Sequence, residues 1–278
     1  MATLILLTTP IGNLDDLTPR AKKIIEDERI FLAEDTRVFM SLCDHLNIDC
    51  SQKRVTSFND HDQKSVSNFL KPLEEGQNVV VVSDAGSPII SDPAYPLVVE
   101  AYRMGHAVDS RPGVSSIVVA LELSGLPIHP FTFHGFFPRD SKKQGEFITK
   151  VKQMGGTQVL FESPHRILES LDYLTEQIPK AQFAISRELT KKFQETIRFS
   201  GSEWSGIRND LVVKGEFVIV FYLEHEFAQI VGSEILELAN DVLKRNDPKN
   251  LSKLLGNLLG KKSKDIYQEL IQQKANPK

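Results

Sequence analysis

Short apolar runs rich in β-branched residues recur along this 278-residue chain, and stretches with helical spacing separate most of them. The first helical stretch has a start signal, Thr18 followed by Pro19, because a hydroxyl N-cap and a proline at the first helical position both favour initiation. Strand and helix therefore alternate, and this order predicts α/β layers with largely parallel sheets. The predicted strands cover residues 3–9, 29–33, 78–83, 131–137, 157–163, 182–189 and 215–223.

The chain is longer than a usual single domain, so at least two domains are expected. Turn-rich segments at 110–116 and 125–133 interrupt the middle of the sequence, and beyond residue 225 the pattern changes to helices alone. We therefore expect one α/β domain over 1–112, a second over 113–225 and a small helical module over 226–278.

The C-terminal module carries a single apolar stripe at helical spacing and reads as two short helices joined near Gly260. Residues 244–278 hold nine Lys or Arg against three Asp or Glu, a balance of +6, which leaves −10 for the rest of a chain whose net charge is −4. This imbalance indicates either a contact with a polyanion or solvated lysines on a helical tail. The stripe consists of Leu251, Leu254, Leu255, Leu258 and Leu259.

The apolar segments and the two cysteines indicate where in the cell the protein is expected. No window approaches eighteen uninterrupted apolar residues, and the N-terminal apolar run has neither a basic flank nor a small-residue cleavage site, so it predicts a first strand rather than a signal peptide. The spacing of Cys43 and Cys50 fits neither a zinc pair nor a disulfide framework, so two free thiols in a reducing compartment are expected. A soluble, cytoplasmic protein without a membrane partner is predicted.

Four consecutive valines, residues 79–82, lead into a loop of small residues. A run without alternation indicates a strand covered on both faces, hence a central one, and ligands of open α/β sheets lie outside the carboxyl ends of strands. Asp84 could accept hydrogen bonds from a ligand. Ala85, Gly86 and Ser87 have little bulk and would let a planar or extended ligand lie against the backbone. The alternative is that Asp84 only initiates a turn and Pro88 starts the next helix.

Two further loops of the first half have similar composition. Pro10 and Gly12 follow the first predicted strand and fit either a ligand loop or a plain turn. Glu34, Asp35 and Arg37 follow the second predicted strand, where Asp35 or Thr36 could simply cap the next helix.

Charged residues of the second half gather at or beyond predicted strand ends rather than on polar helix faces. Such charges are either paired with one another or aimed at a ligand, and the sequence leaves both readings open. They are Glu162, Arg166, Arg187, Glu188 and Lys191.

Several catalytic motifs are missing from the sequence. There is no G-x-G-x-x-G after the first strand, no Walker A sequence, no H-E-x-x-H and no G-x-S-x-G. Dinucleotide, nucleoside-triphosphate, zinc-protease and α/β-hydrolase functions are therefore disfavoured.

Taken in order, eight segments of the chain resemble the small-subunit ribosomal RNA methyltransferase I family, ribose 2′-O-methyltransferases of the tetrapyrrole methylase superfamily. The resemblance covers nearly the whole chain. It implies two α/β domains of the tetrapyrrole methylase type, S-adenosylmethionine bound between them, a homodimer, and methylation of a cytidine ribose in small-subunit (16S) ribosomal RNA. Ribosomal RNA or the small subunit is thus the expected partner. The segments are "TPIGNLDDLTPRA", "AEDTR", "SDAGSPIISDPAYPLV", "PGVSS", "GLP", "FESPHR", "RELTK" and "KGEFVIV".

The resemblance also implies roles for individual residues, and it implies no metal site. The cofactor positions would be Pro10, Gly12, Asp84, Gly86, Ser87, Ser115, Ser116, Phe161 and Leu189. The positions facing the RNA and the methyl-transfer point would be Asp35, Arg37, Glu162, Arg187, Glu188 and Lys191. Of these, Glu188 or Asp35 is the favoured general base.

Two segments depart from the family pattern. The family usually has Phe-His-Glu-His-Asn where this chain has residues 58–62, "FNDHD", and Pro-Gly-Pro-Ser-Ala where it has 112–116, "PGVSS". These departures are compatible with the chain being a divergent member or paralogue of the family, with an altered target preference. A methyltransferase of tetrapyrroles or other small acceptors and a non-catalytic ribosome-binding paralogue stay open as alternatives.

Overall fold

The computed structural model describes residues 2–58, 66–90, 94–224, 248–259 and 261–275. Residues 59–62 of the altered "FNDHD" segment therefore lie outside the described residues. Met1–Thr149 and Gly156–Leu223 form one compact unit, and Lys150–Gly155 with Glu224–Lys278 form a second. The predicted domain boundary at residue 112 stays a prediction.

The first sheet is parallel throughout, with strand order β3-β2-β4-β1-β5. The four-valine strand β4 is central, as its unbroken apolar run predicted. The strands are β1 (Thr3–Leu7), β2 (Ile30–Ala33), β3 (Arg54–Ser57), β4 (Val79–Val82) and β5 (Ala107–Arg111). The helices between them are α1 (Pro19–Asp27), α2 (Thr36–His45), α3 (Val66–Glu74) and α4 (Tyr95–Arg103).

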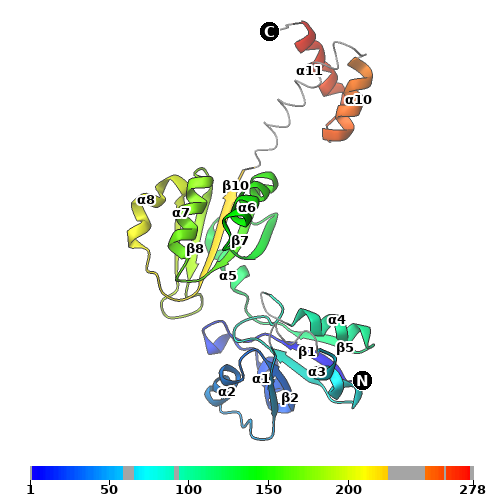
Figure 1. The fold of residues 1–278 in the computed structure, drawn as a ribbon, viewed down its shortest axis with the longest axis vertical. Helices are drawn as coiled ribbons and strands as arrows, with labels where there is room; N and C mark the ends of the chain where they lie inside the picture. The colour runs from blue at the N-terminus through cyan, green and yellow to red at the C-terminus, as the bar shows by residue number, and fades with distance from the viewer. Residues whose placement is uncertain (1, 59–65, 91–93, 225–247, 260, 276–278) are drawn as a thin grey trace. The chain divides into compact units, whose positions relative to one another are not determined.

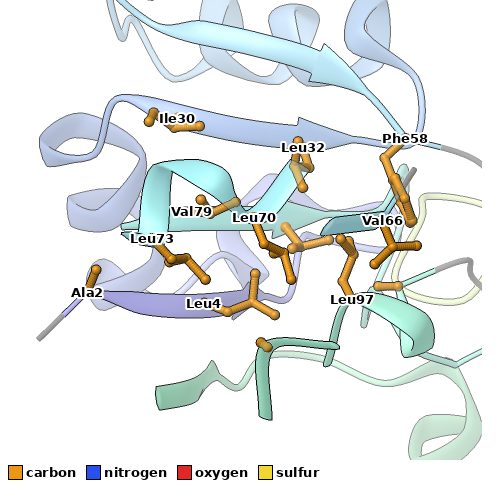
Figure 2. Close-up of a cluster of buried hydrophobic side chains, with 13 residues drawn as sticks. Ala2, Leu4, Ile30, Leu32, Phe58, Val66, Leu70, Leu73, Val79 and Leu97 are labelled. Carbon is orange, nitrogen blue, oxygen red and sulfur yellow. The ribbon is translucent and has the colours of Figure 1, made fainter. Parts of the chain in front are cut away.

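Both faces of this sheet are covered because successive side chains of a strand point to opposite faces. Val80 and Val82 pack with α1 and α2 through residues such as Ile25 and Phe39. Val79 and Val81 pack with α3 and α4, and Figure 2 shows this second cluster, including Leu4, Leu70 and Leu97. Figure 1 shows the two helix pairs on opposite sides of the sheet.

Strand order reverses between β1 and β4. From β1 the chain crosses to β2 and then β3 on one side, whereas from β4 it returns past β1 to β5 on the other. The loops that leave β1 and β4 therefore diverge, which opens a crevice at their carboxyl ends. Thr9 and Gly86 hold these loops together, each accepting the other's backbone N–H, at 3.0 and 3.2 Å.

The second sheet has order β6-β7-β10-β8-β9. Its strands are β6 (Phe131–Phe136), β7 (Gly156–Glu162), β8 (Gln182–Arg187), β9 (Glu195–Ser200) and β10 (Phe217–Leu223). Helix α5 (Ser116–Ser124) packs on one face through Ile117, Ala120 and Leu121. The remaining helices of this half are α6 (Ser141–Met154), α7 (Ile167–Gln177) and the four-residue α8 (Trp204–Ile207).

Two sequence-based predictions about the sheets were wrong. The second sheet is not largely parallel, because only β6 and β7 run parallel and the other three pairings are antiparallel. Strands β3, β5 and β9 were missed. Each is an edge strand with polar residues and few fully buried positions, so it lacks the apolar run that marked the central strands.

The C-terminal module contains α10 (Pro248–Leu259) and α11 (Ser263–Ala275), which confirms two short helices joined near residue 260. Leu251 and Leu255 pack with Ile266 and Leu270 of the second helix. The side chains of Leu254, Leu258 and Leu259 lie outside the described residues.

Candidate functional site

A cavity of about 450 Å³ opens at the switch point of the first sheet. The loop after β4 supplies Asp84, Ala85, Gly86 and Ser87, and the loop after β1 supplies Ile11. Helix α5 contributes its first residues, and the second sheet contributes the opposite wall. A volume above 300 Å³ with a mainly apolar lining and a few polar groups is typical of a small-molecule site.

Asp84 is one of the carboxylates that line this cavity, and it is held by the loop after β2. Its Oδ1 accepts the backbone N–H of Asp35 at 3.0 Å, while Glu34 Oε2 accepts the backbone N–H of Asp84 at 3.2 Å. Burial raises the pKa of Asp84 above its ordinary value, although the Asp35 N–H opposes this shift. Glu34 also lines the cavity, so the two loops present neighbouring acidic side chains.

The amino end of α5 forms a second polar wall. Ser115 is the N-cap residue with extended backbone, and its side chain makes no cap hydrogen bond. The first-turn N–H groups of a helix have no intrahelical acceptor and attract negative charge. Ser115 and Ser116 line the cavity, so this helix end presents hydroxyl and amide donors to it.

The wall from the second sheet is aromatic and aliphatic. The rings of Phe136 and Phe161 meet edge to face with centroids 5.8 Å apart, and Leu189 and Val218 complete the surface. Phe136 remains 56% exposed, so a planar ligand can lie against it.

Glu162 ends β7 in the cavity wall, but its fully buried side chain already has several partners. It accepts hydrogen bonds from the Ser170 hydroxyl at 2.6 Å and the Ser163 N–H at 2.8 Å. Arg166 Nη2 lies 3.4 Å from its carboxylate and donates to the carbonyls of Phe137 and Pro138. This network fixes the turn after β7.

The charges beyond β8 are also paired with one another. Arg187 Nε forms a salt bridge with Glu195 Oε2 at 2.7 Å. Lys191 Nζ lies 3.0 Å from Glu188 Oε1 and 3.3 Å from Glu216 Oε2. Burial acts to lower the pKa of Lys191, but these two carboxylates outweigh it and the pKa lies above its ordinary value. Lys191 is therefore a persistent cation.

Backbone strain marks the segment Glu188–Lys191, which we name the β8 loop. Glu188 and Thr190 have φ of 51° and 63°, an uncommon left-handed conformation for residues other than glycine. Thr190 Oγ1 accepts the backbone N–H of Asn13 at 3.1 Å, which ties the β8 loop to the loop after β1. Strain of this kind persists only where the surrounding structure enforces it, and it clusters at functional sites.

Asp35 is the N-cap of α2. Its carboxylate accepts the backbone N–H of Arg37 at 2.8 Å, and Arg37 Nη2 lies 2.5 Å away. These Arg37 contacts hold the pKa of Asp35 at about 2. Arg37 itself is 89% exposed.

Pro10 and Gly12 line an adjacent hollow of about 270 Å³, on the side of α2. The two hollows share Ile11, Asp84 and Ala85 as a wall. A Cβ on Gly12 would overlap Lys191 Cγ and lie 3.1 Å from the Leu189 carbonyl oxygen, so glycine here permits the close approach of the β8 loop.

Most of the residues assigned to the cofactor gather at one place. Asp84, Gly86, Ser87, Ser115, Ser116, Phe161 and Leu189 line the cavity, together with Glu162. Asp35, Arg37, Arg187, Glu188 and Lys191 are not among its lining residues, and their roles stay predictions. Ala85 lines the cavity beside Gly86 and Ser87, as its small size predicted. Sequence reasoning assigned no site role to the other lining residues. Most of them stand inside a quoted motif, Ile117 directly follows one, and Phe136 lies in a predicted strand: Ile11, Glu34, Ile90, Ile117, Phe136, Ser163, Pro164, Glu216, Phe217 and Val218.

Within the described residues, no helix is both long and apolar enough to cross a membrane.

Comparisons with known proteins show which family this chain is similar to. The model of the Tetrapyrrole (Corrin/Porphyrin) Methylases matches residues 3–204. Ribosomal RNA small subunit methyltransferase I of Thermotoga maritima is 42% identical over 73% of this chain and 90% of its own, and that of Pseudomonas aeruginosa is 31% identical over 97% of both.

A solved structure shares the fold at low identity. Uroporphyrin-III C-methyl transferase from Thermus thermophilus, complexed with S-adenyl homocysteine, superposes with a TM-score of 0.54 at 16% identity, over 83% of this chain and all of that one. The chain therefore belongs to the tetrapyrrole methylase family and, within it, to the methyltransferases named ribosomal RNA small subunit methyltransferase I.

Proposed function

We propose that this protein transfers the methyl group of S-adenosylmethionine to the 2′-hydroxyl of a cytidine ribose in small-subunit ribosomal RNA. The observation that carries the proposal is the 450 Å³ cavity at the switch point, whose wall unites seven residues assigned to the cofactor from motifs far apart in the sequence. The family membership supplies the reaction class, and the relatives' names supply the RNA.

The cavity lining matches the chemistry of S-adenosylmethionine. The amino end of α5, where the Ser115 hydroxyl makes no cap hydrogen bond, suits the carboxylate of the methionine part. Asp84 suits ribose hydroxyls or the α-amino group, which are donors. The wall of Phe136, Phe161 and Leu189 suits the adenine ring. The residues present therefore fit the cofactor.

Bound S-adenosylmethionine supplies a methyl group already activated by its sulfonium. The remaining task of the protein is to hold the acceptor oxygen in line with carbon and sulfur and to exclude water. Gly86, with φ of 79°, and the paired Thr9 and Gly86 backbones fix the floor on which that alignment depends. No metal has a part in this proposal.

A base that accepts the hydroxyl proton would assist the transfer. A carboxyl with a pKa of about 2 is a weak base, which makes Asp35 the poorer of the two candidates. Both contacts of Glu188, with Lys191 Nζ and with the backbone N–H of Glu216, fall on Oε1, so Oε2 can accept a proton without displacing either partner. We therefore favour alignment as the larger contribution and Glu188 as the assisting base.

Single-turnover rates test this assignment. Glu188→Gln should slow transfer more than Asp35→Asn if Glu188 is the base. Near-normal rates in both variants would mean that neither carboxylate accepts the proton and that alignment alone carries the reaction.

The acceptor is to be established by incubating the protein with labelled S-adenosylmethionine and, in parallel, small ribosomal subunits, deproteinised ribosomal RNA and a porphyrinogen. Label is expected in a 2′-O-methylcytidine, mapped by mass spectrometry and missing from cells that lack the protein. Label in the porphyrinogen alone, or no binding of S-adenosylmethionine in calorimetry, would contradict the proposal.

Assembly and location are part of the same proposal. The protein acts as a homodimer in the cytoplasm, where small subunits are assembled. Light scattering of the full chain at micromolar concentration tests the dimer, and a monomer that retains full activity would remove this part of the proposal.

A further inference from the structure

Phe193 lies in the connection between β8 and β9 with 65% of its surface exposed. It is the most exposed phenylalanine among the described residues, since Phe136 and Phe131 are 56% and 45% exposed. Single exposed apolar residues are ordinary on protein surfaces, so exposure alone assigns nothing. The surroundings of Phe193 are what distinguish it.

The loop that carries Phe193 is ordered on both sides of the ring. The Gln194 N–H donates to the Lys191 carbonyl at 3.0 Å, and Gln194 Oε1 accepts the Thr190 N–H at 2.7 Å. Two hydrogen bonds thus close the loop around residues 192 and 193. The strained φ values of Glu188 and Thr190 show that this shape is enforced rather than incidental. A loop whose backbone is held in advance loses little backbone freedom when a ligand covers the ring it carries.

The same loop forms part of the candidate site. Leu189 lines the cavity, and four residues span at most about 14 Å, so the Phe193 backbone lies within that distance of Leu189. The contacts of Thr190 with Asn13 and of Lys191 with Gly12 hold the loop against the loop after β1. Phe193 is therefore carried by the same short connection as a residue of the cavity wall.

The chemistry of the exposed surface favours a nucleobase. The Lys192 ammonium lies 5.7 Å from the centroid of the Phe193 ring, and no salt bridge of Lys192 is found within the described part of the chain. Lys191, by contrast, is neutralised by two carboxylates. An exposed aromatic face next to an uncompensated cation is how proteins bind unstacked bases, with the ring taking the base and the cation taking the phosphate.

We propose that Phe193 is a stacking platform for an unstacked base of the acceptor RNA, next to the nucleotide that is methylated, and that Lys192 contacts the adjoining phosphate. This inference rests on the proposed RNA function and adds a binding subsite to it. The ring stacks irrespective of base identity, so it contributes affinity and placement rather than sequence readout.

Three variants test the platform against small ribosomal subunits and deproteinised ribosomal RNA. Phe193→Ala should weaken RNA binding or raise KM roughly 5- to 150-fold, the range found when a stacking aromatic is removed. Phe193→Trp should retain binding. Tyr102→Ala is the matched control, because Tyr102 on α4 is a similarly exposed aromatic residue, at 63%, that lines neither hollow, and it should bind RNA normally.

Two further measurements separate a loss of RNA stacking from a loss of folding or of cofactor binding. S-adenosylmethionine affinity and the melting temperature should be unchanged in all three variants. A fourth variant, Lys192→Ala, should lose about one phosphate contact, which lowers the slope of RNA affinity against salt concentration by roughly 0.7. Wild-type RNA affinity in Phe193→Ala would overturn the inference while leaving the proposed function intact. A wild-type protein that methylates no RNA would overturn the function itself. Loss of self-association in Phe193→Ala would show that a second copy, not RNA, covers the ring, which also overturns the inference.

Discussion

At the scale of single residues, Asp84 shows a conflict between ligand binding and stability. Burial raises its pKa, so the folded protein favours the protonated carboxyl. Such a group contributes stability below its unfolded pKa, and that contribution is lost as the pH rises through the folded pKa. At neutral pH the ionised carboxylate therefore weakens the fold, which is common where a residue is kept for binding.

Asp84→Asn should separate the two effects. The amide oxygen can still accept the Asp35 N–H, so the melting temperature at pH 7 should equal or exceed that of the wild type, with the difference shrinking toward pH 4. S-adenosylmethionine affinity should fall about tenfold or more, since a hydrogen bond to a charged group is lost. Calorimetry and thermal melts at both pH values check this. A lower melting temperature at pH 7 would show that Asp84 is structural.

Gly12 tests whether the close approach of two loops matters. Gly12→Ala should destabilise the protein by about 1–3 kcal/mol, because the added Cβ overlaps Lys191 Cγ and crowds backbone. Gly145→Ala in α6 is the control, since its Cβ meets nothing within 4 Å and alanine favours a helix. Denaturant unfolding of both variants measures the difference. Equal stability of the two would mean that the β8 loop yields without cost.

At the scale of elements, the β8 loop explains why charges beyond a strand were hard to interpret from sequence. The residues "RELTK" could be paired or aimed at a ligand, and the structure pairs Arg187, Glu188 and Lys191 with carboxylates or each other. Leu189, the apolar residue among them, is the one that lines the cavity. The charges thus support a loop whose apolar residue reaches the site.

Thr190→Val should weaken cofactor binding without changing the fold. Valine keeps the shape and β-branching of threonine but loses the oxygen that accepts the Asn13 N–H. The expected loss is about 1 kcal/mol in S-adenosylmethionine affinity, roughly fivefold, because the loop after β1 is released. Thr190→Ser retains the oxygen and should bind normally. Identical affinities in both variants would show that the two loops are held by other contacts.

Central and edge strands differed in how well the sequence predicted them. The four valines of β4 are buried on both faces of the sheet, and such a strand favours an unbroken apolar run. The prediction that β4 is central was therefore confirmed. The edge strands β3, β5 and β9 are paired on one side only and carry residues such as Arg54, Asp109 and Arg198. Their backbone pairing depends on neighbours far away in sequence, which no local pattern reports.

At the scale of the whole molecule, the C-terminal module belongs to a compact unit separate from the one that holds the cavity. Deleting residues 226–278 should therefore weaken RNA binding more than S-adenosylmethionine binding. Loss of three or more phosphate contacts would lower the salt slope of RNA binding by about two. Titrations of both ligands against the truncated chain check this, and equal loss of both would indicate a structural role for the module.

The sequence by itself determined the alternation of strands and helices, the central place of the valine strand, the C-terminal helix pair and the family, because these depend on local pattern and ordered motifs. Only the tertiary structure decided that the loops of Asp84, Ser115, Phe161 and Leu189 meet in one cavity, that the second sheet is mixed, and which charges are paired. Side-chain pairing and strand direction are set by contacts between distant segments, and those contacts form only when the sheets assemble.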